Sequence, residues 1–263
     1  MPLYTLKDRI QSYQSLTDIR LMKGLPIIII LNGRSFRKIT SLLNKPFSDE
    51  FIELMCACMI KLASEIDGVI FVYSFNDEII LVVRNEQLLE LQAWYDNKVQ
   101  KIVSATASIT TNEFGKVAKM KGYNILGDPI FICNTFAVPN MIEAMNVLIA
   151  KQQQAQHNAL YNVCFYELLK KHDPTTVKQT IDNKTAQEKA DLLYDTCGID
   201  FYDYNISYRR GYACFRAPKV INTPSGDEIR NKLVIEMSLP IFSKEPEFLE
   251  NIFKGGKDII RER

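Results

Sequence analysis

Histidine is scarce in this chain, and no pattern of metal-binding cysteines makes up for it. The two histidines, His157 and His172, argue against a histidine-based zinc site. The six cysteines include no Cys-x-x-Cys pair. We therefore expect reduced, mostly buried packing cysteines rather than a metal or redox centre. They are Cys56, Cys58, Cys133, Cys164, Cys197 and Cys214.

Long apolar runs are also missing, and so is any excess of one charge. No run is long enough to span a membrane, and the first residues lack the apolar core of a secretory signal. We therefore expect a cytoplasmic protein without a membrane partner. Lysine and arginine total 32 against 31 aspartates and glutamates, a net charge of +1. Because there is no global positive field, nucleic acid would have to be bound by local patches.

The 263 residues, 47% of them hydrophobic, allow one large or two small cores, and a β-hairpin stands out among them. Val69–Phe75 and Glu78–Val83 are rich in β-branched and aromatic residues, and Asn76-Asp77 between them is ordinary turn chemistry. A turn explains Asp77 but not why a second carboxylate, Glu78, opens an apolar strand. Two adjacent carboxylates at the tip of a buried hairpin repel each other unless positive charge lies beside them. A divalent cation is the natural candidate.

A second strand is expected beside this hairpin. The unbroken apolar run Ile27–Leu31 predicts a fully buried strand that stops at Asn32-Gly33. A helix predicted from its N-cap Ser48 to about Ile66 leads back to the hairpin. A right-handed crossover, with the returning hairpin arm inserted between the first two strands, gives a split βαβ arrangement. That arrangement brings the end of the first strand against the hairpin tip.

The segment Asn32–Arg37 has two interpretations from its residues alone. It is either a turn in which Gly33 permits positive φ and Arg34 and Arg37 are solvated, or a nest of backbone N–H groups. Such a nest would hold a triphosphate, and the flanking arginines would add charge.

Three segments together resemble the tRNA-His guanylyltransferase family. They are Ile28–Phe36, which ends in Asn32-Gly33-Arg34-Ser35-Phe36, then Lys45-Pro46-Phe47, then Tyr73–Ile79, which contains Asn76-Asp77-Glu78. The family pattern is Asp-Gly-Arg-x-Phe, then Lys-Pro, then Gln-Ser-Asp-Glu on a hairpin, and the order and spacing agree. The resemblance implies an α+β fold with a polymerase-palm, ferredoxin-like split βαβ catalytic core over residues 1–137. A helical and β-hairpin C-terminal extension, residues 138–263, would pack on the palm.

The resemblance also implies Mg²⁺-dependent phosphoryl chemistry, with two Mg²⁺ ions at the hairpin tip and GTP and ATP as substrates. The implied metal ligands are Asn32, the Gly33 carbonyl and Asp77, and the implied catalytic residues are Asp77, Glu78 and Asn32. The implied nucleotide-binding residues are Asn32, Gly33, Arg34, Ser35, Phe36, Arg37, Lys45, Asn76 and Asp77. The implied contacts to RNA are Lys151, Asn158, Arg209 and Arg210.

The implied activity is addition of nucleotides, GTP preferred, in the 3′-to-5′ direction to the 5′ end of tRNA. This is either tRNA-His guanylylation or repair of tRNA 5′ ends. The family histidine position is Gln156 here, with His157 one place on, which favours the tRNA-repair "like" proteins. The family suggests a homotetramer. Two other functions stay open: a palm-type nucleotide cyclase and a non-catalytic relative that binds RNA or nucleotide.

One departure from the family pattern concerns the metal site. The family's first metal ligand is an aspartate, and this chain has Asn32. An amide oxygen ligates Mg²⁺ without adding charge, which should weaken binding by roughly several kcal/mol even at an effective dielectric near 20. Three hypotheses stay open: an engineered trap, a natural inactive relative, and an enzyme that compensates through Glu78 or the phosphates of the nucleotide.

Between the hairpin and residue 139, we expect three more elements and one family segment. A helix is predicted over about residues 86–101, and Ile102–Ile109 is predicted as the fourth strand of an antiparallel sheet of order 4-1-3-2. Phe114–Asn124, which carries Lys116, Lys119 and Lys121, is predicted as a solvated loop, with an RNA contact as the alternative. Phe131–Pro139 resembles the family segment Phe-Asp-Ala-Arg-x-Phe, with Asn134 at the arginine position.

The last part of the chain is predicted to be helical at first. Asn140 caps a long helix that runs to about Lys171, and a capping box at Thr185 opens a short helix. Tyr208–Gly211 resembles a family Tyr-Arg-Lys/Arg-Gly stretch and is predicted on a strand, which puts Arg209 and Arg210 on opposite faces. Val220–Lys232 is predicted as a turn-rich excursion, followed by a charged tail from residue 254.

Overall fold

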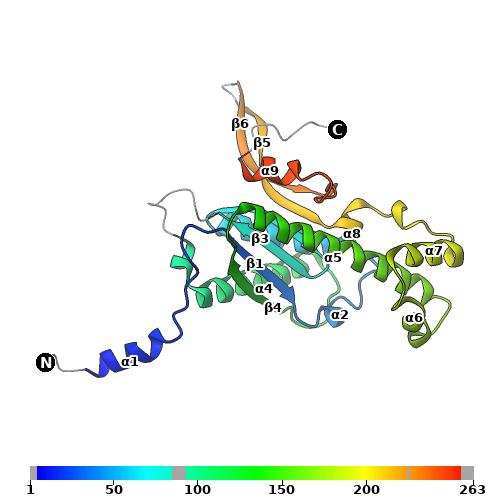
Figure 1. Ribbon diagram of the computed structural model, residues 1–263, viewed down its shortest axis with the longest axis horizontal. Coiled ribbons are helices and arrows are strands. Elements are labelled where there is room, and N and C mark those ends of the chain that lie inside the picture. Colours follow the sequence, from blue (N-terminus) through cyan, green and yellow to red (C-terminus); the bar gives the residue numbers. More distant parts are fainter. Residues whose placement is uncertain (1–4, 85–92, 224–225, 256–263) are drawn as a thin grey trace.

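A six-stranded antiparallel sheet is the centre of the computed structural model, which describes residues 5–84, 93–223 and 226–255 (Figure 1). The strand order is β4-β1-β3-β2-β5-β6. The strands are β1 (Ile27–Gly33), β2 (Val69–Phe75), β3 (Glu78–Val83), β4 (Phe131–Ala137), β5 (Tyr212–Thr223) and β6 (Gly226–Glu236).

The predicted split arrangement is confirmed in its central part. The hairpin arm β3 lies between β1 and β2, and Ile27 to Asn32 pair with Val83 to Glu78. The order 4-1-3-2 is also found, but the fourth strand is β4 and not Ile102–Ile109. The mixed helix and antiparallel-sheet class is therefore as expected.

Residues Ile102–Ile109 belong to the long helix α4 (Val99–Lys121), so the strand prediction is wrong. The buried residues of α4 are four apart, which is the helical period: Ile102, Thr106, Thr110, Phe114 and Ala118. The same helix replaces most of the loop expected at Phe114–Asn124. The β-branched residues suggested a strand, but the burial of one helical face against β1 and β4 decides the outcome.

Helices α3 (Asp49–Glu65) and α4 cover one face of the sheet. The Ser48 Oγ accepts a hydrogen bond from the Phe51 amide at 3.2 Å, which makes Ser48 the N-cap as predicted. Ile27, Ile29 and Leu31 of β1 point into the same core as the buried side chains of α3. The loop before α4 departs from the expected helix, because Tyr95, Asp96 and Asn97 have positive φ within the short 3₁₀ turn η1 (Trp94–Asn97). Val99–Lys101, the end of that predicted helix, are helical and belong to α4, and residues 86–92 lie outside the described residues.

The other face of the sheet is covered by α5 (Met141–Leu168) and α9 (Glu247–Phe253). Asn140 caps α5 through a hydrogen bond from the Glu143 amide at 3.0 Å, as expected. Ile28, Ile80 and Val82 point toward this face. The alternation of β1 and β3 therefore places Asn32 and Glu78 on the α5 side of the sheet.

The second half of α5 packs on helices that follow it: α6 (Pro174–Ile181), α7 (Ala186–Cys197) and, further along the chain, α8 (Ile206–Arg210). Asp173 caps α6, and the predicted capping box at Thr185 opens α7. Because α5 packs on both the sheet and these helices, it joins the two parts of the chain (Figure 1). The division into residues 1–137 and 138–263 stays a prediction.

Two further expectations about the C-terminal part are wrong. Tyr208–Arg210 lie on helix α8, not on a strand, so the argument from opposite faces does not apply. Val220–Lys232 belongs to the long β5–β6 hairpin, in which Val220 pairs with Ile229. Residues 256–263 of the predicted tail lie outside the described part of the chain.

Three further observations concern the N-terminal helix, the cysteines and the length of the helices. Helix α1 (Leu6–Ser15) lies apart from the rest of the protein, and all its residues are exposed (Figure 1). All six cysteines are free, and four of them are buried. No helix in the described ranges is long and apolar enough to cross a membrane.

Candidate active site at the hairpin tip

The hairpin tip and the end of β1 form one connected unit. Asn76 adopts the left-handed conformation (φ 46°) in the two-residue turn, a conformation that asparagine tolerates well. The Gly33 amide donates to the Asp77 carbonyl at 2.9 Å, and Asn32 lies opposite Glu78 in the strand register. The structure thus places Asn32, Gly33, Asp77 and Glu78 together.

Asp77 is a half-buried carboxyl with no counter-ion among the described residues. Burial raises its pKa above the ordinary value, its own backbone hydrogen bond lowers it less, and the like charge of Glu78 raises it further. No lysine or arginine of the described chain pairs with it. A half-buried carboxylate in this situation favours a bound cation or a proton.

Glu78 differs from Asp77 because it already has a cationic partner. The Lys151 Nζ of α5 lies 2.7 Å from Glu78 Oε1, and the two side chains are 22% and 11% exposed. We expected Lys151 to contact RNA, but the structure directs its ammonium to the hairpin tip.

The loop after β1 uses part of the proposed N–H nest for its own structure. The Gly33 amide bonds to the hairpin, and the Arg34 amide donates to the Ile130 carbonyl at 2.8 Å. Neither amide is therefore free for a triphosphate. Ser35, which adopts φ 58°, precedes the short helix α2 (Phe36–Ile39), so the nest is reduced to the amides around Ser35 and Phe36.

Gly33 has a second structural role. A Cβ at this position would lie 2.3 Å from Cδ2 of the buried Phe36 ring. That ring packs edge-on against Phe51, Phe114 and Phe131 and cannot easily retreat. The glycine lets the loop close over this aromatic cluster, which sets the position of α2.

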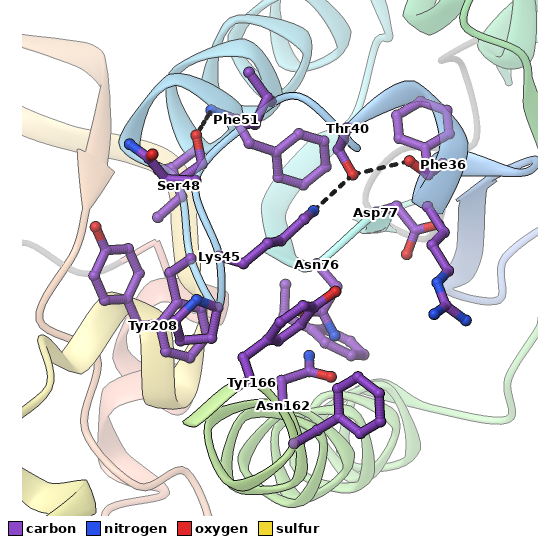
Figure 2. Close-up of a pocket in the computed structure, with 18 of the residues that line it drawn as sticks. Phe36, Thr40, Lys45, Ser48, Phe51, Asn76, Asp77, Asn162, Tyr166 and Tyr208 are labelled. Carbon is purple, nitrogen blue, oxygen red and sulfur yellow. Dashed lines mark hydrogen bonds between the residues drawn. The ribbon is translucent and has the colours of Figure 1, made fainter. Parts of the chain in front are cut away.

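A pocket of about 490 Å³ opens beside the hairpin tip (Figure 2). It lies among the α2–α3 loop, the hairpin tip, and helices α5, α6 and α8. Five of the implied nucleotide-binding residues line it: Phe36, Arg37, Lys45, Asn76 and Asp77. Asn32, Gly33, Arg34, Ser35 and Glu78 are not among the lining residues.

Lys45 is the cation most clearly directed into this pocket. Its Nζ donates to Thr40 Oγ1 at 3.1 Å, and Thr40 Oγ1 donates in turn to the Phe36 carbonyl at 2.9 Å (Figure 2). Burial, and then the nearby Arg37 charge, lower the pKa of Lys45. No described carboxylate contributes to that shift, so an anionic ligand would supply the missing counter-charge.

The walls of the pocket are aromatic, which the sequence interpretation did not assign. Phe47 and Tyr208 stack with ring centroids 4.5 Å apart and 7° between their planes, and the Tyr208 hydroxyl donates to Asp49. Tyr161 and Phe165 of α5 stack at 6.4 Å. The motif match at Tyr208–Gly211 contained one of these residues, but only the fold brings the rings opposite Lys45.

The implied RNA contacts Arg209 and Arg210 support the local structure. Arg209 Nε donates to the Tyr204 carbonyl at 2.8 Å, and an Arg210 Nη donates to the Leu239 carbonyl at 3.1 Å. The next residue, Gly211, has φ 75°, and a Cβ there would lie 2.5 Å from the Ser74 carbonyl oxygen. The close approach of this motif to β2 therefore requires glycine. Asn158 is half-buried on α5 and, like both arginines, does not line the pocket.

The oxygen donors at the tip fit Mg²⁺ in kind but carry little charge. Mg²⁺ prefers carboxylate, amide and carbonyl oxygens, which Asp77, Asn32 and the Gly33 backbone offer. Over the described ranges, no group of three or more histidines, cysteines and acidic residues is able to hold a metal ion. Asp77 alone combines a negative charge with the lack of a cationic partner, so a nucleotide would have to supply further negative charge.

The strand order, the hairpin tip and the pocket define a palm-like α+β protein. Residues 7–139 match the family described as tRNAHis guanylyltransferase, and residues 146–244 match the Thg1 C terminal domain. The chain belongs to the tRNAHis guanylyltransferase family.

Curated relatives with this description are about a quarter identical to the chain over the aligned residues. The tRNA(His) guanylyltransferase 1 of Arabidopsis thaliana is 24% identical over 237 residues, which cover 87% of this chain and 40% of the relative. The chain thus spans about two fifths of the length of that relative. A probable tRNA(His) guanylyltransferase of Dictyostelium discoideum is 24% identical over 226 residues, 82% of this chain and 86% of the relative.

Solved structures share the fold over most of the chain. A bacterial tRNA(His) guanylyltransferase (Thg1)-like protein in complex with ATP has a TM-score of 0.81 and 25% identity, and the match covers 94% of this chain and 98% of the other. A structure of such a protein in complex with GTP has a TM-score of 0.76 and 25% identity, with the same coverage. The Saccharomyces cerevisiae enzyme, at 18% identity, has a TM-score of 0.69 over 85% of this chain and 96% of the other.

Proposed function

We propose that this chain is a Mg²⁺-dependent nucleotidyltransferase that adds nucleotides, GTP preferred, to the 5′ end of tRNA in the 3′-to-5′ direction. The observation that carries the proposal is the pocket, where the cations Arg37 and Lys45 face the unpaired carboxylate Asp77 between aromatic walls. Cations suit a triphosphate, aromatic rings suit a base, and the carboxylate suits a metal bound to the phosphates. Family membership and the similar proteins solved with ATP and GTP support the same substrates.

Each group of residues in the site would have a separate role, set by its position. Lys45 and Arg37 would bind phosphate oxygens, and the free amides around Ser35 and Phe36 would orient them. Asp77, with the Asn32 and Gly33 oxygens, would hold Mg²⁺, which when bound stabilises negative charge on the attacking and leaving oxygens. Asn76, by its left-handed turn, sets the direction in which Asp77 points.

The RNA partner and the assembly are part of the same proposal. Asn158, Arg209 and Arg210 are proposed contacts to tRNA phosphate, although both arginines already donate to backbone carbonyls. The homotetramer and the cytoplasmic location stay predictions. Light scattering of the purified protein measures the subunit number directly.

A second candidate is a relative that binds nucleotide and RNA without catalysis. Two observations favour it: Asn32 brings no charge to the metal site, and Glu78 is already paired with Lys151. Nucleotide would then bind through Lys45 and the aromatic walls without productive Mg²⁺ geometry.

One experiment separates these functions. The chain is incubated with Mg²⁺, labelled GTP and a 5′-monophosphorylated tRNA that lacks its first nucleotide, with Asp77→Asn as the matched control. Label transferred to the tRNA by the unchanged chain alone supports the enzyme. GTP binding without transfer supports the non-catalytic relative, and a new nucleotide product formed without RNA would indicate a cyclase. Absence of binding and transfer would refute the proposal.

A further inference from the structure

The charges at the hairpin tip are balanced by a side chain from another element. Asn32 and Glu78 lie opposite each other in the strand register, on the face of the sheet that α5 covers. On that face Lys151 contacts Glu78 at 2.7 Å. The charges of Glu78 and Lys151 cancel, and Asn32 is neutral. Together with Asp77, these residues carry a net charge of −1.

The turn of α5 that carries Lys151 is anchored to another part of the chain. The next residue, Gln152, is buried, and its Nε2 donates to the Pro240 carbonyl at 2.8 Å while its Oε1 accepts from the Phe242 amide at 2.8 Å. These two bonds fasten this turn of α5 to the chain after β6. Lys151 Nζ also donates to Gln154 Oε1 at 3.4 Å. These contacts hold the backbone of Lys151 in place, and its ammonium lies 2.7 Å from Glu78 Oε1 as an ion pair, although that oxygen accepts no hydrogen bond of good geometry.

This ammonium has a direct consequence for metal binding. A glutamate that pairs with lysine at 2.7 Å in a mostly buried site has little negative potential left for a dication, and the ammonium itself repels one. Asn32, on the neighbouring strand, does not replace that charge. Two divalent cations bound at this tip would therefore have Asp77 as their single protein carboxylate that is not paired with a cation.

We infer that Lys151 is a positioning residue that withholds Glu78 from metal binding, so that the tip binds one divalent cation, through Asp77 and the nucleotide, rather than two. The inference deepens the proposed function and rests on it for the nucleotide. Lys151 thereby takes the place of the second cation as the counter-charge of Glu78.

The first test counts metal ions. Mn²⁺ replaces Mg²⁺, and electron paramagnetic resonance measures the Mn²⁺ held per protein-bound molecule of a GTP analogue with a methylene between the α- and β-phosphates. One ion per bound nucleotide is expected. Two ions per bound nucleotide in the unchanged chain would overturn the inference, and this count needs no variant to fold.

The second test is a Mn²⁺ titration without nucleotide, which compares the unchanged chain with Lys151→Met, Lys151→Arg and the double variant Glu78→Gln/Lys151→Met. We expect Lys151→Met to bind Mn²⁺ at least tenfold more tightly, because it frees Glu78. The arginine variant keeps the pairing charge and should match the unchanged chain, and the double variant should lose the gain. Equal affinities of the unchanged chain and Lys151→Met would refute the role of Lys151.

The outcomes distinguish this inference from the proposed function. If the GTP analogue does not bind at all, the proposed function fails. The titration without nucleotide still decides whether Lys151 withholds Glu78, because it measures the metal alone.

Discussion

Breaking the Glu78–Lys151 pair should cost the protein stability in a way that its geometry predicts. Replacing Lys151 by methionine keeps most of the side-chain volume but leaves the Glu78 carboxylate buried and unpaired. Removing one partner of a fully buried pair costs about 3–5 kcal/mol. With side chains 22% and 11% exposed, water relieves part of this cost, so we expect about 3 kcal/mol. For a chain of this size that corresponds to a fall in melting temperature of roughly 6–10 °C.

The measurement is a double-mutant cycle of thermal or urea unfolding in EDTA, without nucleotide. Glu78→Gln alone should cost less, because the remaining Lys151 ammonium reaches solvent more easily than a buried carboxylate does. The double variant Glu78→Gln/Lys151→Met removes both charges and should be more stable than Lys151→Met alone. The expected coupling energy is about 2 kcal/mol.

The same double-mutant cycle can also contradict the prediction. If the two single losses add to the loss of the double variant within about 0.5 kcal/mol, the side chains do not interact in solution. Lys151→Arg is the control for helix α5, because it preserves the charge and the helix propensity. A large loss in that variant would indicate damage to packing rather than loss of the pair.

Three other changes test the pocket and the metal site proposed beside it. Asp77→Asn should abolish Mg²⁺-dependent GTP binding in calorimetry. It should also stabilise the metal-free protein at neutral pH: since burial raises the Asp77 pKa, the unchanged chain loses stability as pH rises through that pKa, and the variant does not. Asn32→Asp should raise Mg²⁺ affinity and the single-turnover rate of nucleotide addition together, each at least about tenfold, because one charge near a dication is worth a few kcal/mol at an effective dielectric near 20; equal midpoints would show that residue 32 is not a ligand. Lys45→Met should weaken triphosphate binding about tenfold or more. Triphosphate binding to the unchanged chain should fall as pH rises through the lowered Lys45 pKa, because the ammonium loses its charge. If the affinity of the unchanged chain does not vary with pH in this way, Lys45 is not part of the phosphate site.

Much of the central sheet followed from local patterns. The strands Ile27–Leu31, Val69–Phe75 and Glu78–Val83 are mostly apolar runs bounded by turn residues, and such runs have few alternatives in a chain of this size. The crossover rule then placed β3 beside β1 and brought Asn32 next to Glu78. Local caps were also predictable, because Ser48 and Thr185 bond to amides three residues away.

Other segments had local patterns that pointed the wrong way. Ile102–Ile109 has strand-forming residues, but its burial four residues apart on one face makes it helical. Arg209 and Arg210 were predicted to lie on a strand, but they belong to helix α8. The chain turns at the next residue, Gly211, where its backbone packs closely against β2. In both places packing against a distant element overrides local preference.

The sequence by itself determined the hairpin, and it predicted the two carboxylates and the cation Lys45 as components of a candidate site. The tertiary structure decided what each component faces. Lys151 contacts Glu78, Tyr208 stacks on Phe47, and Asp77 has no counter-ion within the described part of the chain, although no local pattern relates these residues. The physical reason is that charge and burial depend on distance in space, and helices α5 and α8 reach the hairpin tip only when the sheet and the C-terminal helices pack together.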